Sequence, residues 1–160
     1  MSELFMHEAI KEAKTGISLG DGGPFGAVIV KNGEIVGRGH NMVVKNNDPT
    51  AHAEVMAIRD ACSNLKTYDL SGCTIYSTGQ PCSMCYSALM WANVQEIYYS
   101  CPFEYADNVG FRDTLINEHV TNFNELITNG DITAKVCLMH VPECDELYKD
   151  WNESSSKKLY

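Results

Sequence analysis

Residues 80–85 read Gln-Pro-Cys-Ser-Met-Cys (QPCSMC) and place two cysteines three positions apart behind a proline. The stretch from Pro81 to Trp91 predicts a helix, so both sulfurs project from its first turn in a similar direction. The amino end of a helix carries partial positive charge, which lowers the pKa of a thiol and favours the thiolate that zinc binds. The motif therefore predicts half of a metal site at the start of a helix.

The other half is His52-Ala53-Glu54, at the start of a second predicted helix. A Cys-x-x-Cys pair alone also occurs in redox proteins and structural zinc sites, and a lone histidine is most often a capping or core residue. One neutral histidine and two thiolates together balance a zinc ion and leave a fourth tetrahedral position for water, the ligand count of a catalytic site. His52, Cys82 and Cys85 are therefore the predicted metal ligands.

Glu54 is the predicted catalytic residue. Because it stands two positions after His52, it projects in a different direction and is better placed to contact the water than to bind the metal. Zinc lowers the pKa of a bound water toward about 7, and a carboxylate beside it can carry a proton to a ring nitrogen and then to a leaving amine. His-x-Glu followed by Pro-Cys-x-x-Cys is the known signature of zinc-dependent nucleobase deaminases.

Composition restricts the remaining possibilities. The 160 residues suffice for one domain with a substantial core, so folding requires neither a disulfide nor a structural metal. Seven cysteines, an odd number, suit a reducing cytoplasm better than a secreted disulfide framework. Neither a membrane span nor a signal peptide is evident, so we expect a cytoplasmic protein without a membrane partner. The net charge of −9 makes nucleic acid an unlikely partner.

Helix-like and strand-like segments alternate along the chain. The apolar periodicity predicts helices over 4–19, 51–62, 81–91 and 143–151, and a loop over 41–50. Strands are predicted over 26–30, 34–40, 73–78, 96–101 and 133–140, the first two joined by a hairpin at Lys31-Asn32-Gly33. This order predicts an α/β fold, a three-layer α/β/α sandwich with a five-stranded mixed sheet, in a single domain over residues 1–160.

The chain resembles the cytidine and deoxycytidylate deaminase superfamily and, within it, the bacterial guanine deaminases, over nearly its whole length. The resemblance rests on the stretches GGPFGAVIVKNGEIV, NNDPTAHAEVMAIR, PCSMC, ALMWANVQEIYY, VGFRD and KKLY. It implies a cytidine deaminase-like fold, one zinc ion per subunit, a small-molecule nucleobase substrate and hydrolysis of guanine to xanthine and ammonia. It also implies a homodimer in which the C-terminal segments, about residues 143–160, are exchanged between subunits.

The same resemblance implies contacts with the substrate. Phe25 would pack on the face of the base, although it could equally be a core residue. Asn41 would hydrogen-bond the edge of the ring through its amide, although asparagine is also common in turns. The backbone N–H of Ala53 would help to hold the carbonyl of the substrate.

Three further positions follow from the resemblance. Asp113 would accept hydrogen bonds from the N–H groups of guanine, with Asp107 and Glu118 as alternatives if the alignment shifts. Trp91 corresponds to an aromatic residue near the pocket, and Tyr160 to a C-terminal tyrosine that closes the active site. Each could instead be an ordinary surface, core or tail residue.

Two positions in the metal loop depart from the family pattern. Gln80 stands where relatives commonly have glutamate, and Ser83 where proline is frequent. Neither position is a metal ligand. The missing acid at position 80 changes the charge beside the pocket, so the identity of the preferred base stays open. A tRNA adenosine deaminase shares the same motifs, but the net charge, Phe25 and the acidic stretch 143–151 oppose it. A cytosine deaminase, which GRGHNM resembles, and a non-enzymatic zinc-stabilised binding module also stay open.

Overall fold

The computed structural model describes residues 2–121 and 153. The chain divides into two units, Met1–Glu118 and His119–Tyr160, and the fold below is that of the first. The predicted strand 133–140, the predicted helix 143–151 and Tyr160 lie outside the described residues. Among the described helices, none combines the length and apolar character needed to cross a bilayer.

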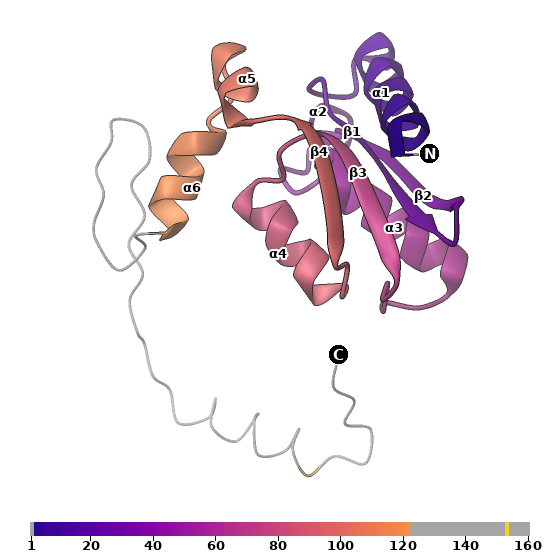
Figure 1. Ribbon diagram of the computed structural model, residues 1–160. Coiled ribbons are helices and arrows are strands. Elements are labelled where there is room, and N and C mark those ends of the chain that lie inside the picture. The colour runs from indigo at the N-terminus through magenta and orange to yellow at the C-terminus, as the bar shows by residue number, and fades with distance from the viewer. Residues whose placement is uncertain (1, 122–152, 154–160) are drawn as a thin grey trace. The chain divides into compact units, whose positions relative to one another are not determined.

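A mixed sheet forms the centre of the unit, with its strands in the order β2-β1-β3-β4 (Figure 1). Strand β1 runs antiparallel to β2 and β3, whereas β3 and β4 are parallel. The described residues thus contain four of the five predicted strands. The strands are β1 (Gly26–Lys31), β2 (Glu34–His40), β3 (Cys73–Gly79) and β4 (Glu96–Cys101).

The hairpin between β1 and β2 forms where the sequence predicts it. Asn32 and Gly33 both adopt positive φ angles, 52° and 82°, the backbone that a two-residue turn between strands requires. The register shifts between Ile29 and Val30, so the pairing contains a local irregularity. The predicted strand boundaries at 34–40 and 96–101 match the structure.

Three helices cover the two faces of the sheet (Figure 1): α1 (Ser2–Leu19), α3 (Ala53–Leu65) and α4 (Ser83–Trp91). The core has two parts, one on each face of the sheet, because successive side chains of a strand such as β1 point to opposite faces. Ala27 and Ile29 pack with residues of α3 and α4, whereas Val28 packs with Ala9 of α1. The unit therefore has three layers, as the sequence predicts.

The prediction of a loop over 41–50 was wrong in part, because α2 (Val43–Asn46) forms within it. β-branched valines disfavour a helix, and no periodic pattern marks this single turn. Hydrogen bonds to a distant residue stabilise the turn, since the backbone N–H groups of Val44 and Lys45 both donate to the carbonyl of Asp21. Two other helices were not predicted: α5 (Phe103–Asn108) and α6 (Asp113–Thr121).

Two glycines of β2 bring the backbone of α3 directly onto the sheet. A Cβ atom on Gly39 would lie 2.4 Å from both the carbonyl oxygen of Ala53 and the nitrogen of Ala57. One on Gly37 would lie 2.5 Å from the carbonyl oxygen of Ala57. Such distances are shorter than any real contact, so only glycine permits this packing, and the start of α3 is fixed by it.

The strand register brings several loops together along one edge of the sheet, namely the edge formed by the ends of the strands. Gly26 pairs with His40 and Ala27 pairs with Ser77, so the amino end of β1 meets the carboxyl ends of β2 and β3. The residues just beyond these ends are Phe25, Asn41 and Gln80. Helix α3 begins over the same edge, and α4 follows β3 directly.

We expect Gly39→Ala to lower the free energy of unfolding by about 1–3 kcal/mol, because the added methyl group would push α3 from the sheet. Chemical denaturation of the purified proteins measures the change. Glu34→Ala, at an exposed position of the same strand, is the control and should change stability by about 0.5 kcal/mol or less. Equal stability of wild type and Gly39→Ala would show that the packing relaxes without cost.

Candidate active site

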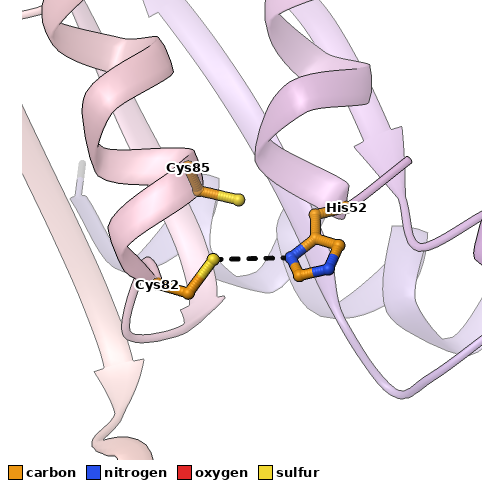
Figure 2. A group of neighbouring side chains, drawn as sticks. All are labelled: His52, Cys82 and Cys85. Carbon is orange, nitrogen blue, oxygen red and sulfur yellow. Dashed lines mark hydrogen bonds between the residues drawn. The ribbon is translucent and has the colours of Figure 1, made fainter. Parts of the chain in front are cut away.

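The predicted metal ligands lie at the starts of two neighbouring helices, and Figure 2 shows their side chains pointing toward one another. His52 is the N-cap of α3 and Cys82 the N-cap of α4, both with extended backbone, and Cys85 lies in the first turn of α4. Neither side chain forms the usual N-cap hydrogen bond. Both instead point to the space between the two helix starts, as Figure 2 shows.

The donor set and its spacing fit a zinc ion. The ligand atoms of His52, Cys82 and Cys85 all lie within 4.8 Å of one another, and Cys82 Sγ is 3.6 Å from His52 Nδ1. Tetrahedral zinc with Zn–S bonds of about 2.3 Å places its ligand atoms roughly 3.5–4 Å apart. Three such donors, two of them buried, could hold zinc and leave one coordination position open.

Charge within the cluster already favours a metal-binding form. A hydrogen bond from the Cys85 thiol lowers the pKa of Cys82 to about 4, with a further contribution from His52 and against the effect of burial. As the donor in that bond, and as a buried group, Cys85 has a raised pKa. The interaction with Cys82 also raises the pKa of His52. The lowered pKa of Cys82 thus favours the thiolate form that a metal ion binds.

Glu54 lies in the wall of a pocket together with His52 and Cys82. Its side chain is buried, with 6% of the residue exposed, and its Oε1 accepts a hydrogen bond of 3.0 Å from the hydroxyl of Ser77. Burial is the main cause that raises the pKa of the Glu54 carboxyl. A carboxylate with a raised pKa is a stronger base than an exposed one, which suits a group that has to accept a proton.

The pocket has a volume of about 450 Å³ and is built from the edge of the sheet described above. Phe25, Asn41, Gln80 and Asp113 line it beside the metal-binding cluster. A second cavity of about 260 Å³ shares Phe25, Gln80 and Asp113 with it. The pocket therefore brings these four residues, all singled out in the sequence, together with His52, Glu54 and Cys82.

The environment of Asn41 fixes the direction of its amide. Its Oδ1 accepts hydrogen bonds from the backbone N–H groups of Gly23 (3.3 Å) and Val43 (3.2 Å). Backbone N–H groups can only donate, so oxygen rather than nitrogen must face them. The NH₂ group of Asn41 is then the part left to donate a hydrogen bond to a ligand.

Phe25 borders the pocket with an aromatic partner that the sequence analysis did not select. Its ring meets that of Phe111 edge to face, with centroids 4.9 Å apart and an interplanar angle of 74°. Phe111 also lines the larger cavity. The only sequence signal was its place in VGFRD, a stretch that carries the family resemblance.

The structure separates Asp113 from the two alternative acids. Asp107 accepts hydrogen bonds from the backbone N–H of Thr114, at 3.4 Å, and from its hydroxyl, so it caps the start of α6. Glu118 is exposed and lines neither cavity. Asp113 lines both, and burial followed by the nearby Cys82 raises the pKa of its carboxyl.

Two more of the selected residues are described. Ala53, fully buried, is the first residue of α3 and stands between His52 and Glu54. Trp91 ends α4, is 67% exposed and lies in a shallow hollow with Tyr86 and Met90. Within the described residues, the structure therefore does not bring Trp91 to the larger pocket.

Residues 1–101 match the family model of the cytidine and deoxycytidylate deaminase zinc-binding region. The chain belongs to this deaminase family. Over 158 residues it is 45% identical to the guanine deaminase of Bacillus subtilis (strain 168), an alignment that covers 99% of this chain and 98% of that protein. The crystal structure of guanine deaminase from Bacillus subtilis superposes with a TM-score of 0.88 and 37% identity, covering 99% and 98% of the two chains.

A different branch of the deaminase family matches over a shorter region. The tRNA-specific adenosine deaminase of Aquifex aeolicus (strain VF5) is 45% identical over 98 residues, which are 61% of this chain and 64% of that protein. The identity is as high as for the guanine deaminase, but the alignment is shorter. The length of the aligned region, not the percentage identity, therefore distinguishes the guanine deaminase from the tRNA-specific adenosine deaminase.

We expect Cys85→Ser to lower the affinity for zinc by at least about 10-fold, because a serine hydroxyl does not provide the thiolate that this cluster offers. Zinc content after dialysis against a chelator series, measured by atomic spectroscopy, provides the test. Cys62→Ser is the matched control, since Cys62 is a free thiol outside the cluster. Unchanged zinc content in Cys85→Ser would exclude this cluster as the metal site.

Proposed function

We propose that this protein is a zinc-dependent guanine deaminase that hydrolyses guanine to xanthine and ammonia. The observation that carries the proposal is the match to guanine deaminase over 99% of this chain and 98% of the relative. The polar groups of the pocket support it, because they combine hydrogen-bond donors with a carboxylate acceptor. A purine with a carbonyl and several N–H groups needs both.

His52, Cys82 and Cys85 are the proposed ligands of one zinc ion per subunit. When bound, zinc would supply Lewis-acid activation of the water that attacks the amino-bearing carbon. The family model describes a zinc-binding region, and the three donors lie close enough to share one ion. Burial of both cysteines keeps these ligands away from solvent and competing reactions.

Glu54 is the proposed proton shuttle. Its carboxylate takes one proton from the attacking water and passes it to a ring nitrogen. It then takes the remaining proton of the added hydroxyl and delivers it to the departing amine, so that the C–N bond breaks, ammonia leaves and the new carbonyl remains. The burial that raises the pKa of Glu54 makes its carboxylate a stronger base for the first transfer. The position of Glu54 in the pocket wall beside His52 supports the assignment.

Four residues are proposed to hold the base. Phe25 packs against its face and is held by its edge-to-face contact with Phe111. The amide NH₂ of Asn41 and the backbone N–H of Ala53 donate to acceptors of the ring. The carboxylate of Asp113 accepts from its N–H groups, which guanine presents along one edge and cytosine does not present in the same arrangement.

The competing functions fit less well. A tRNA adenosine deaminase must hold a polyanion while a base is extruded, and a net charge of −9 opposes this. A closed structural zinc site has no use for a carboxylate beside an open coordination position, the role proposed for Glu54. Cytosine would leave Asp113 without its full set of donors.

The assembly and location of the enzyme remain part of the proposal. We infer a homodimer in which the segments 143–160 are exchanged, with Tyr160 closing the pocket, because this chain aligns with guanine deaminase through its C-terminal region. A cytoplasmic location is supported by the five described cysteines, all of which are free thiols.

The direct test is deamination of guanine by zinc-loaded protein, followed by ultraviolet absorbance and by ammonia release. We expect turnover of guanine in preference to cytosine and adenosine, and a decrease in kcat of about 100- to 10,000-fold in Glu54→Gln, because the amide cannot carry the proton. Equal rates for wild type and Glu54→Gln would refute the shuttle. No turnover of guanine by a zinc-replete preparation would refute the substrate assignment.

Asp113→Asn tests the recognition of the base separately from the chemistry. We expect kcat/KM for guanine to decrease by about 10-fold or more, mainly through KM, because a charged acceptor is replaced by a neutral amide. Glu104→Gln removes the same charge from an exposed site on α5 and is the control. If both variants bind guanine like wild type, Asp113 does not contact the base.

A further inference from the structure

Ser77 is a polar residue at a position where the strand pattern calls for an apolar one. Along β3, Cys73, Ile75 and Ser77 alternate onto one face and are all buried. Cys73 and Ile75 belong to the apolar cluster between the sheet and helices α3 and α4. Ser77 is fully buried as well, with 0% of the residue exposed. A buried hydroxyl is unfavourable unless it forms a hydrogen bond.

The partner of this hydroxyl is Glu54. Ser77 Oγ donates to Oε1 of Glu54 over 3.0 Å, and Glu54 is itself only 6% exposed. When the carboxylate is ionised it can only accept, so the proton of this bond belongs to serine. The strand, the hydroxyl and the carboxylate thus form one connected unit between the centre of the sheet and the pocket.

The backbone of Ser77 is fixed on both sides. It pairs with Ala27 of β1 and with Tyr99 of β4, so its hydroxyl is carried by an interior strand rather than by a loop. Groups on such strands hold their partners with greater precision than groups on loops. Glu54, by contrast, reaches the pocket on a side chain with three rotatable bonds.

We propose that Ser77 is a positioning residue that holds Oε1 of Glu54 and thereby fixes the orientation of the carboxylate for proton transfer. The inference rests on the proposed role of Glu54 as proton shuttle. A general base acts only within hydrogen-bond reach of its proton, so a carboxylate free to rotate spends less time in the productive position. Ser77 does not touch the substrate; its effect passes through Glu54 and falls on kcat rather than on KM.

The experiment compares Ser77→Ala with the matched pair Ser77→Thr and Ser77→Val. Threonine and valine have nearly the same shape, but only threonine keeps the hydroxyl, so the pair separates hydrogen bonding from volume. We expect kcat to decrease about 10- to 100-fold in Ser77→Ala and Ser77→Val, with KM and zinc content within about 3-fold of wild type, and we expect Ser77→Thr to recover most of the loss.

A second hydroxyl on the same strand provides the control. Thr74 Oγ1 donates to Oε2 of Glu96 over 2.9 Å, a bond of the same kind outside the pocket. Thr74→Ala should leave kcat unchanged. If Ser77→Ala keeps the wild-type kcat, or if Ser77→Val is as active as Ser77→Thr, the proposal is wrong. Loss of zinc or of folded protein in parallel with activity in Ser77→Ala would also overturn it, because the role would then be structural.

A measurement that does not depend on turnover separates this inference from the proposed function. The carboxylate stretching band of Glu54 is identified in the infrared spectrum as the band that Glu54→Gln removes. We expect that band to shift in Ser77→Ala, because the hydrogen bond is lost, and to stay in place in Thr74→Ala. If guanine is not turned over but the band shifts, the substrate assignment fails and the contact stands. If the band does not shift, the positioning role fails whatever the substrate.

Discussion

The contact of α3 with the glycines of β2 is the constraint on which the site depends. Because Gly37 and Gly39 have no side chains, the helix backbone lies on the strand, and the first turn of α3 has one possible position along it. That turn carries both His52 and Glu54, whose proposed roles require their side chains to point in different directions. A helix held at a greater distance by ordinary side chains could slide or tilt and would separate the histidine from the cysteines of α4.

The starts of α3 and α4 differ from ordinary helix starts in a way that indicates function. Serine, threonine, aspartate and asparagine are the preferred N-caps, since their side chains accept a hydrogen bond from the first turn. Here the caps are His52 and Cys82, and neither makes such a bond. Both helices therefore lack this stabilisation. The partial positive charge at their amino ends faces the cluster and favours a thiolate there. Departures from local rules of this kind are expected at functional sites.

Local patterns predicted the parts of this structure that depend on neighbouring residues. Asn32-Gly33 predicted the hairpin, and the two short motifs predicted the group formed by His52, Cys82 and Cys85. Helix α2 was missed because the backbone N–H groups of Val44 and Lys45 donate to Asp21, more than twenty positions away. Ser77 was missed for the same reason, because its importance lies in a contact with Glu54 that no spacing in the sequence reveals.

The family resemblance implies a glutamate at position 80, and the acids around Gln80 explain how a neutral residue fits there. Gln80 lines both cavities together with Asp113, and its Oε1 accepts the backbone N–H of Phe103 at 3.4 Å, a bond that a carboxylate oxygen could make equally well. The loop geometry therefore does not require a particular charge at this position. The pKa of Asp113 is already raised by burial and by Cys82, and a second carboxylate nearby would raise it further. A neutral residue at position 80 thus favours the ionised form of Asp113, the form that the proposed contact with the N–H groups of a purine requires.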